Sequence, residues 1–291
     1  MHPFVIFLVL LSAAMHALRN FFNKTALDKQ AFVWWYESIG VLLFTPVFVY
    51  TLLHPDTNTH ISVILIFLSG FAHFVYWYFL SKALEKGDLS LVYPIMRSSP
   101  VLVLLFSIIT LGEDVSLIGA SGIMLVTIGI YTINMQSLAF SELIRPIKAI
   151  TRDRAIQFAF LTLFSVAAYS LVDKIAVSRM NPVLLAYLYP WVSLSLYTSY
   201  ILKAKPAGVL KKEWSARKGS ILLCGMLSIF GYFLILVAFT TERVSYVAGL
   251  RQLSIVFAVL LGGHFLKEKN KGIRIASSVI IFAGAYLITI G

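Results

Sequence analysis

Charged residues are scarce in this sequence. Asp, Glu, Lys and Arg make up only 13% of its 291 residues, against roughly 25% in soluble domains. Hydrophobic residues make up 59%. A soluble chain of this length needs a polar surface that so few charged residues cannot supply. The composition therefore excludes a soluble globular protein and predicts a chain that resides in a membrane.

Cysteine and enzyme motifs are nearly absent. Cys224 is the only cysteine, which excludes an intrachain disulfide and a cysteine metal cluster, and we expect it to pack within an apolar run. The sequence has no Walker-type glycine-rich loop ending in Gly-Lys-Ser/Thr, and no HExxH or GxSxG motif. ATP-driven or hydrolytic activity is therefore not expected, and neither a metal nor a cofactor is predicted.

Long apolar runs are abundant instead. A helix needs about 20 apolar residues to cross a hydrocarbon core of roughly 30 Å. Ten such runs occur, at approximately 3–25, 32–53, 61–83, 89–111, 116–135, 155–177, 182–202, 218–240, 244–265 and 272–290. These runs are too long and continuous for a transmembrane β-barrel. The first lacks the preceding Lys or Arg of a signal peptide, so we expect a retained helix. The sequence predicts an all-α polytopic membrane protein of ten transmembrane helices.

The basic residues are distributed unevenly between the connections. The formal net charge is +11, which by itself would suit nucleic-acid binding. Among the basic residues near the ends of the runs, however, only Arg179 and Arg243 lie at even-numbered connections. The odd-numbered connections carry Lys29, Lys82, Lys86, Arg145, Lys148, Arg152, Arg154, Lys203, Lys205, Lys211, Lys212, Arg217, Lys218, Lys267, Lys269, Lys271 and Arg274. Basic loops mark the cytoplasmic side. We therefore predict external termini in the cell (inner) membrane, with the lipid bilayer and not a nucleic acid as partner.

The two halves of the chain are related by a repeat. Residues 83–133 match residues 238–288 at a constant offset of 155, and Ser90, Ser99 and Glu113 recur as Ser245, Ser254 and Glu268. One period contains five apolar runs, so the second copy is inverted in the bilayer. Inverted repeats are typical of secondary transporters, whose binding sites lie near the bilayer midplane. The predicted domains are two five-helix repeats, 1–135 and 155–291, joined by a cytoplasmic linker over 136–154.

Three groups of residues resemble a known family. They are Gly87-Asp88-Leu89-Ser90-Leu91-Val92-Tyr93-Pro94 followed by Arg97, Arg251-Gln252-Leu253-Ser254-Ile255-Val256-Phe257, and His16-Ala17 with Asn20. Gly112-Glu113 and Lys267-Glu268 each close the fourth helix of a repeat. Together these resemble the EamA-type transporters of the drug/metabolite transporter superfamily, over nearly the whole chain. The resemblance implies a central cavity, with the fifth and tenth helices mainly as buttresses, and it specifies the substrate poorly.

Intramembrane charges are the best pointers to a binding site, because each costs about 3 kcal/mol or more to bury unless it is paired or hydrated. Arg97 and Arg251 lie at nearly equivalent depths in the fourth and ninth runs. Two guanidinium groups suit a carboxylate, phosphonate or phosphate, since their planar fork binds oxyanions through two hydrogen bonds. The alternative for each is a structural cation bonded to carbonyl groups or to an acid such as Glu37.

Two acids could carry a coupling proton. Glu37 lies inside the second run, where a buried carboxylate can load and release a proton; its alternative role is to neutralise Arg19 or Arg97. Asp173 is second, since its place near a helix end favours a local pair with Lys174. Glu113 and Glu268 sit where the following helix begins, so we expect them to be stabilised by free backbone N–H groups there.

Polar stripes and proline residues complete the predicted path. Ser12, His16, Arg19, Asn20 and Asn23 share one face of the first run, and Thr162, Ser165, Tyr169, Ser170 and Asp173 share one face of the sixth. Of these, His16, Asn20 and Tyr169 are predicted to line the path, with Tyr93. His16 and His73 are expected to be hydrogen-bonded within the bundle and not metal ligands. Pro94, Pro100 and Pro190 predict kinks that expose backbone polar groups.

The sequence therefore predicts a secondary transporter for a small polar metabolite. Arg97 and Arg251 would bind its anionic group, and an amino acid or amino-phosphonate would also suit the acid nearby. The competing classes are an intramembrane enzyme acting on lipid or lipid-linked sugar, for which no set of catalytic acids is assembled, and a non-transporting scaffold or receptor. Substrate identity, direction, the use of protons as coupling ion and the choice between monomer and homodimer stay open.

Overall fold

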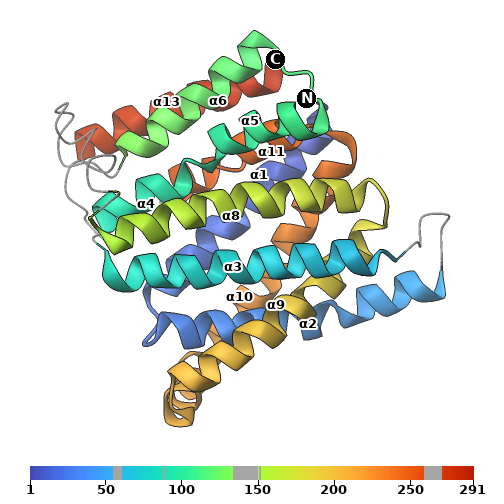
Figure 1. Cartoon of the computed structure of the whole chain (residues 1–291), viewed down its shortest axis with the longest axis vertical. Coiled ribbons are helices and arrows are strands. Elements are labelled where there is room, and N and C mark those ends of the chain that lie inside the picture. Colours follow the sequence, from blue (N-terminus) through green and yellow to red (C-terminus); the bar gives the residue numbers. More distant parts are fainter. Residues whose placement is uncertain (55–60, 88, 134–149, 151, 259–270) are drawn as a thin grey trace.

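The computed structural model describes residues 1–54, 61–87, 89–133, 150, 152–258 and 271–291, and within these ranges it consists of helices and the turns between them. The helices, labelled in Figure 1, are α1 (Pro3–Lys24), α2 (Lys29–Leu53), α3 (Val63–Lys86), α4 (Leu89–Arg97), α5 (Ser99–Leu111), α6 (Leu117–Thr132), α8 (Arg154–Val177), α9 (Pro182–Ala204), α10 (Ala207–Thr241), α11 (Val244–Leu250) and α13 (Lys271–Ile290). The predicted all-α class is confirmed. Most of the predicted linker and Glu268 lie outside the described residues.

Seven helical stretches among the described residues are long and apolar enough to cross a membrane: 3–24, 29–53, 63–85, 92–111, 154–177, 207–241 and 272–290. α6 and the stretch Val244–Ala258 are apolar but shorter. α9 has 23 residues, but its sequence is rich in Tyr and Ser, and it is not among the seven. A core of buried Val, Leu, Ile and Phe side chains joins helices from both halves of the chain.

The helices run back and forth between two ends of the bundle (Figure 1). At one end, called the odd end below, α1 connects to α2, α3 to α4 and α9 to α10. At the other, the even end, α2 leads to α3, α5 to α6, α8 to α9 and α10 to α11. Both termini lie at the even end and adjoin each other, because the Met1 amino group donates to the carbonyl oxygen of Thr289 at 2.9 Å.

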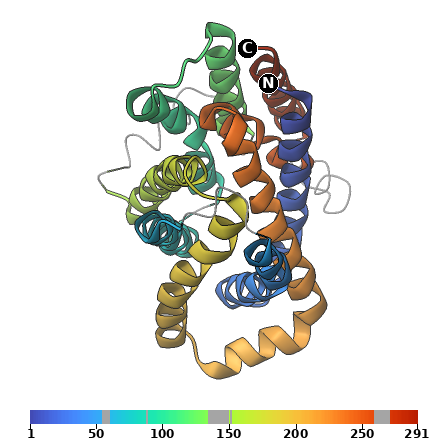
Figure 2. The same cartoon turned by 90° about the vertical axis from the view of Figure 1, so that its right-hand side faces the viewer.

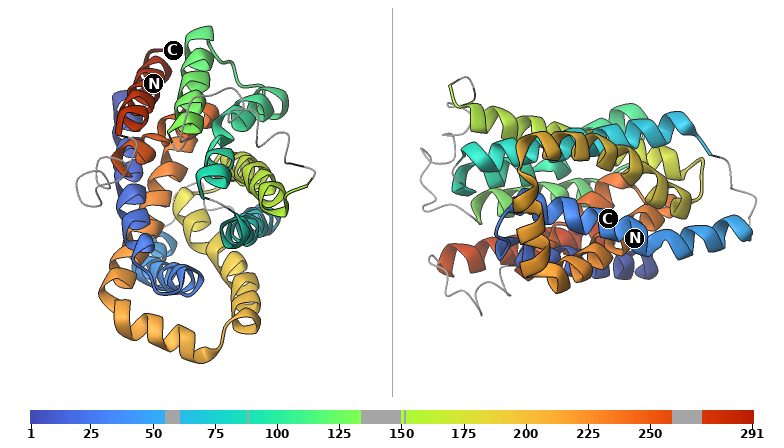
Figure 3. Two further views of the ribbon diagram at one scale, coloured as in Figure 1. Left: turned by 90° about the vertical axis from the view of Figure 1, so that its left-hand side faces the viewer. Right: turned by 90° about the horizontal axis from the view of Figure 1, so that it is seen from below.

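Helix contacts recur in pairs that the 155-residue repeat relates. α3 packs on α8 as α10 packs on α1, and α2 packs on α10 as α9 packs on α3. α6 and α13, each the last helix of its half, pack together at one edge of the bundle (Figures 1 and 3). A Cβ atom on Gly122 would lie 2.6 Å from the Gly284 carbonyl oxygen, and one on Gly129 would lie 2.9 Å from that of Ser277. These two close approaches are equivalent under the repeat, so the contact has approximate two-fold symmetry.

The fourth run is broken at Arg97, as its prolines predict. α4 ends at Arg97 and α5 begins at Ser99, with Pro100 in its first turn, where a missing N–H costs least. In the second half α11 ends at Leu250, and Arg251 follows in a turn. Both arginines therefore sit at breaks in repeat-related helices, where backbone groups are free to face a cavity.

Glu113 caps a different helix from the one expected. Its carboxylate accepts from the N–H of Val244 at 2.5 Å and from the Ser245 hydroxyl at 2.6 Å, so it caps α11 in the other half of the chain. The helix that follows Glu113, α6, is capped by the Ser116 hydroxyl instead. The prediction that a helix N-terminus stabilises Glu113 is confirmed. The predicted helix, α6, is wrong, because the N–H group of Val244 in α11 lies 131 residues away in the sequence.

The first part of α10 lies across the odd end and is separated from the rest by non-helical backbone at Arg217 (Figure 2). Glu213 in this part of α10 accepts from the Asp28 N–H at the start of α2 at 2.8 Å, and Lys205, at the end of α9, donates to the Asp28 carboxylate at 2.7 Å. Burial opposes ionisation of Asp28, but the Lys205 hydrogen bond and the N–H groups of Ala31 and Gln30 outweigh it and hold the pKa of this carboxyl below its ordinary value.

Candidate functional site

A pocket lies at the centre of the bundle. Its polar lining comes from both halves of the chain. The charged and histidine side chains in this lining are His16, Arg19, Glu37, His73, Arg97 and Arg251. None of the described residues that line this pocket comes from α6 or α13, but Arg274 of α13 lines the second pocket described below.

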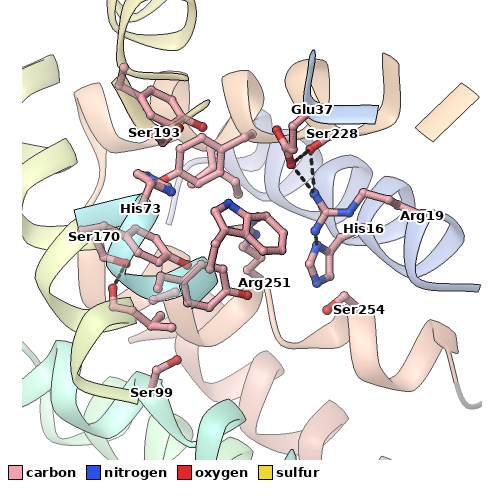
Figure 4. A pocket seen from close by; sticks show the side chains of 18 of the residues that line it. His16, Arg19, Glu37, His73, Ser99, Ser170, Ser193, Ser228, Arg251 and Ser254 are labelled. Atoms are coloured by element: carbon pink, nitrogen blue, oxygen red, sulfur yellow. Dashed lines mark hydrogen bonds and ion pairs between the residues drawn. The ribbon is translucent and has the colours of Figure 1, made fainter. Parts of the chain in front are cut away.

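Arg19, Ser228 and Glu37 form a chain of contacts on one wall (Figure 4). An Arg19 N–H donates to the Ser228 hydroxyl at 2.7 Å, and this hydroxyl donates to Glu37 at 2.8 Å. The Arg19 and Glu37 charges are 3.8 Å apart. Their side chains are 13% and 19% exposed, so the pair is largely desolvated. Glu37 thus lies beside Arg19, the first of its two predicted partners.

His16 lies between two arginines. Its Nδ1 atom is 2.8 Å from Arg19 Nη2, and its Nε2 atom is 3.1 Å from Arg97 Nη2. A neutral imidazole accepts a hydrogen bond at one nitrogen only, whereas a guanidinium group can only donate. One of the two contacts therefore sets an N–H group against another N–H group. The pocket holds more donors here than its own side chains can accept.

Arg251 has the least compensated charge in the pocket. Its guanidinium carbon lies 5.1 Å from the centre of the Tyr232 ring, and no acid or hydrogen-bond acceptor among the described residues contacts it. The neighbouring Gln252 also lines the pocket, and its Oε1 atom is buried without a hydrogen-bond partner among the described residues. A guanidinium group and a buried acceptor, both without a hydrogen-bond partner among the described residues, therefore belong to residues that line the same pocket.

Asp173 is fully buried behind the pocket wall. It accepts from the Ser69 hydroxyl at 2.5 Å, from the Tyr232 hydroxyl, and from His73 Nε2 at 3.0 Å in the tautomer that carries its proton there. Lys174 does not pair with it, since its ammonium group donates to carbonyl groups at the end of α10. The predicted local pair is therefore wrong. The carboxylate points into the bundle and joins α8 to α3 and α10.

Aromatic rings surround His73. Tyr169 and Tyr189 stack on its imidazole at centroid distances of 4.2 and 4.4 Å, and Tyr232 meets it edge-on at 5.2 Å. His73 and these three tyrosines all line the pocket. Both histidines are hydrogen-bonded within the bundle as expected, and the described residues contain no group of His, Cys, Asp and Glu that could hold a metal ion.

A second pocket continues from the first toward the odd end. The two share His16, Arg19, Tyr76, Trp77, Met96 and Arg97. Asn20 and Tyr93 line only the second pocket, where Arg97 lies 5.2 Å from the Tyr93 ring centre. It reaches Lys24 and Lys29, which lie at the odd-end tips of α1 and α2. We call this pocket the vestibule.

The predicted site residues are therefore gathered along one path. Arg97, Arg251, His16, Tyr169 and Glu37 line the central pocket, and Asn20 and Tyr93 line the vestibule. Arg19 was placed in a polar stripe and Asp173 was the second candidate for a coupling proton, but neither was among the residues predicted to bind substrate. The spacing of the polar stripes predicts the helix face on which both side chains lie. Nothing in the sequence pairs them with Ser228, Ser69 or Tyr232.

Comparisons with known proteins agree with this architecture. The sequence profile described as the EamA-like transporter family matches residues 3–135 and again residues 153–290. A solved structure titled "Crystal structure of protein" superposes with a TM-score of 0.73 over 97% of this chain and 98% of that chain, at 16% sequence identity. At this identity the likeness concerns the fold alone. No curated protein matches the chain.

Proposed function

The chain belongs to the EamA-like transporter family, and from this premise we propose that it is a secondary active transporter for a small zwitterionic or anionic metabolite. It is a multi-pass membrane protein of a transporter family. We further propose ten crossings of the cytoplasmic membrane, arranged as two inverted repeats over 1–135 and 155–291 with a linker at 136–154. The paired helix contacts support this arrangement.

The single observation that carries the substrate class is the uncompensated positive charge of the central pocket. Arg19, Arg97 and Arg251 face it, while Glu37 is the one acid among its described lining residues. Burying cations without partners is costly, so a ligand that supplies negative charge is favoured. An oxyanion would accept from Arg97 and Arg251 and relieve the conflict of N–H groups at His16.

A hydrogen-bond donor on the same substrate is favoured by Gln252. Its buried Oε1 atom lacks a partner among the described residues, and an unpaired buried acceptor is unfavourable by about 1–3 kcal/mol. An ammonium or hydroxyl group beside the oxyanion would satisfy it. An amino acid or an amino-phosphonate carries both groups at a short separation. The tyrosine and tryptophan rings of the pocket wall would cover the apolar part of such a molecule.

Glu37 is the proposed coupling acid. As an ion it neutralises Arg19, and a proton on Glu37 would leave Arg19 without a charged partner. A substrate oxyanion could then take the place of Glu37 beside Arg19. Proton and anion would each favour binding of the other, which is the requirement for coupled movement. The competing role for Glu37 is a permanent structural pair with Arg19.

The polarity of the vestibule supports alternating access. The central pocket continues to the odd end through side chains such as Asn20 and Asn23. Toward the even end, Val177, Met180 and Phe239 are buried in the core. We propose that the structure represents the state open to the odd end, and that rocking of the two repeats opens the other side.

Uptake into proteoliposomes tests the proposed function. The purified protein would be offered labelled amino acids, amino-phosphonates, dicarboxylates and neutral sugars, with and without a pH gradient. We expect uptake of a compound that carries an oxyanion and a donor, and none of neutral sugars. Liposomes containing Arg97→Ala and Arg251→Ala together serve as the control. Absence of uptake for every class, or chemical conversion of an added lipid, would instead support the intramembrane enzyme.

A further inference from the structure

Asp173 is fully buried within the bundle, and no described lysine or arginine balances its charge. Resting on the proposed transport function, we propose that Asp173 is a proton-binding site that holds the even end of the path closed while ionised and releases it when protonated. The proton comes from water at the even end, binds a carboxylate oxygen of Asp173, and leaves toward the vestibule after the two ends have exchanged access.

The hydrogen bonds define the ionised state of the closed cluster. The Ser69 and Tyr232 hydroxyls donate to the Asp173 carboxylate, and His73 donates to it in the tautomer that carries its proton on Nε2. An ionised carboxylate only accepts, and it satisfies three donors at once. A protonated Asp173 must donate its own hydrogen, so either His73 changes to the tautomer that accepts at Nε2 or one of the hydroxyl donors turns away. In both cases the hydrogen bonds lose the carboxylate charge that strengthens them. A proton on Asp173 therefore weakens the closed arrangement.

The cluster joins three helices at the even side of the central pocket. Ser69 and His73 belong to α3, Asp173 to α8 and Tyr232 to α10. α8 and α10 belong to the second half and α3 to the first, so the cluster bridges the two repeats. Beyond it, Val177 and Phe239 fill the bundle interior. Releasing this bridge is thus a local change that frees the two halves to separate at the even end.

Tyr232 connects the proton site to the proposed substrate site. Its hydroxyl donates to Asp173, while its ring lies 5.1 Å from the Arg251 guanidinium carbon. A proton on Asp173 that releases the hydroxyl would also free the ring that covers Arg251. The proton and the substrate oxyanion would therefore both act on one side chain.

The other titratable groups around Asp173 do not supply a competing cation. Those that face it are His73 from α3, Tyr232 from α10, Tyr189 from α9 and Tyr169 on α8 itself. α5 carries no titratable residue. Arg251 and Arg97 face Tyr169 across the pocket, and Lys174 is occupied by carbonyl groups. Glu37 differs from Asp173, because a proton on Glu37 leaves Arg19 without a charged partner unless a substrate anion takes the place of the Glu37 carboxylate.

Sided cysteine labelling tests the proposal without a known substrate. The background is Cys224→Ala, which removes the only native thiol. Ser170→Cys then places a reporter on the pocket wall, one helical turn before Asp173. Two exposed positions identify the faces of membrane vesicles: Ser178→Cys at the even end and Ser215→Cys at the odd end. A membrane-impermeant maleimide is applied from one side between about pH 5 and pH 8, and its rates are normalised to the marker on that side.

We expect the reporter to react from the odd side at every pH, because the vestibule is open. From the even side its normalised rate should rise as pH falls. Adding Asp173→Asn should raise the even-side rate roughly tenfold at the upper pH and remove its pH dependence, since a neutral amide gives up the charge-assisted hydrogen bonds. The matched control Asp28→Asn, the same acid-to-amide change at the odd-end start of α2, should keep the pH dependence, because it leaves this cluster intact.

Tyr232→Phe provides a second test in case Asp173→Asn does not fold. It keeps the ring beside Arg251 and removes one donor to Asp173, so the midpoint of the even-side pH dependence should move to higher pH. A purely structural cluster would leave that midpoint in place. Unchanged, pH-independent even-side labelling in both Asp173→Asn and Tyr232→Phe, with normal odd-side labelling, would overturn the proposal. A reporter that never reacts from the even side in any variant would count against alternating access itself.

Discussion

At the scale of single residues, replacing the planar guanidinium group of Arg97 distinguishes a ligand contact from a structural cation. Arg97→Lys keeps the charge but loses the planar fork that binds two oxygens of one anion. We expect apparent substrate affinity to fall roughly ten- to a hundredfold, as for the loss of one charge-assisted hydrogen bond of about 1.5–3 kcal/mol. Concentration-dependent uptake measures the loss, and unchanged thermal stability is the control. Normal uptake by this variant would leave Arg97 a structural cation.

Glu37 offers a second test at this scale. Glu37→Gln mimics the protonated acid without releasing a proton, so accumulation driven by a pH gradient should disappear while substrate-for-substrate exchange remains. The same change leaves Arg19 without its ionic partner. A purely structural pair would therefore show itself as a marked fall in melting temperature, with accumulation and exchange lost together. Unchanged pH-driven accumulation in this variant would rule out coupling through Glu37.

The sequence predicted which charged side chains line the central pocket better than it predicted their partners. Arg97, Arg251 and Glu37 stand out because charges are rare inside apolar runs, and all three line the central pocket. The contacts between residues distant in the chain were not predictable. Arg19 and Ser228 are 209 residues apart, and Asp173 and Ser69 are 104 apart. Asp173 was assigned to Lys174 because adjacency in sequence was the only available guide, and the helix turns the two side chains apart.

At the scale of helices, the start of α2 provides a test in which pH separates two roles. Asp28 caps α2 through the N–H groups of Gln30 and Ala31 and pairs with Lys205. Asp28→Asn keeps a good cap but removes the ion pair, whereas Asp28→Ala removes both. We expect Asp28→Ala to be the less stable variant at pH 7, by about 1 kcal/mol for the lost cap. The partly exposed ion pair should add less than that.

The pH dependence of this effect has a definite sign. The Lys205 hydrogen bond holds the folded-state pKa of Asp28 below its ordinary value of about 3.9. Its contribution is therefore present above that value and is lost as pH falls through the lower, folded-state pKa. The melting temperatures of the parent and Asp28→Asn, measured in detergent, should converge toward acid pH. A constant difference down to the lowest accessible pH would show that the ion pair contributes nothing.

Helix partners followed from the repeat, whereas local irregularities did not. A gap-free repeat implies that contacts occur twice, and the approach of Gly122 to Gly284 is matched by that of Gly129 to Ser277. The break at Arg97 was predicted from proline, whose effect on a helix is local. No proline marks the non-helical backbone at Arg217, and the nearest glycine, Gly219, lies two residues later in helical backbone. Capping of α11 by Glu113 could not be predicted without the tertiary fold, because Glu113 and Val244 are 131 residues apart in the sequence.

At the scale of the whole molecule, orientation decides which compartment the vestibule opens to. The described odd end carries Lys29, Lys82, Lys211, Lys212 and Lys218 among others, against Arg179 and Arg243 at the even end. Basic residues in short connections stay on the cytoplasmic side. Because both termini lie at the even end, we predict that they are external and that this structure is open to the cytoplasm.

Epitope tags in intact cells measure this orientation directly. A C-terminal tag should bind antibody without permeabilisation, and a tag inserted at the exposed Ser215 of the odd end should bind only after it. The two tags serve as each other's control, because an inverted or mixed insertion changes both patterns together. If the C-terminal tag reacts only in permeabilised cells, the vestibule faces outward. The Asp173 cluster would then close the cytoplasmic end, and its proton would come from the cytoplasm. The tag result therefore fixes the direction in which the proposed proton site works.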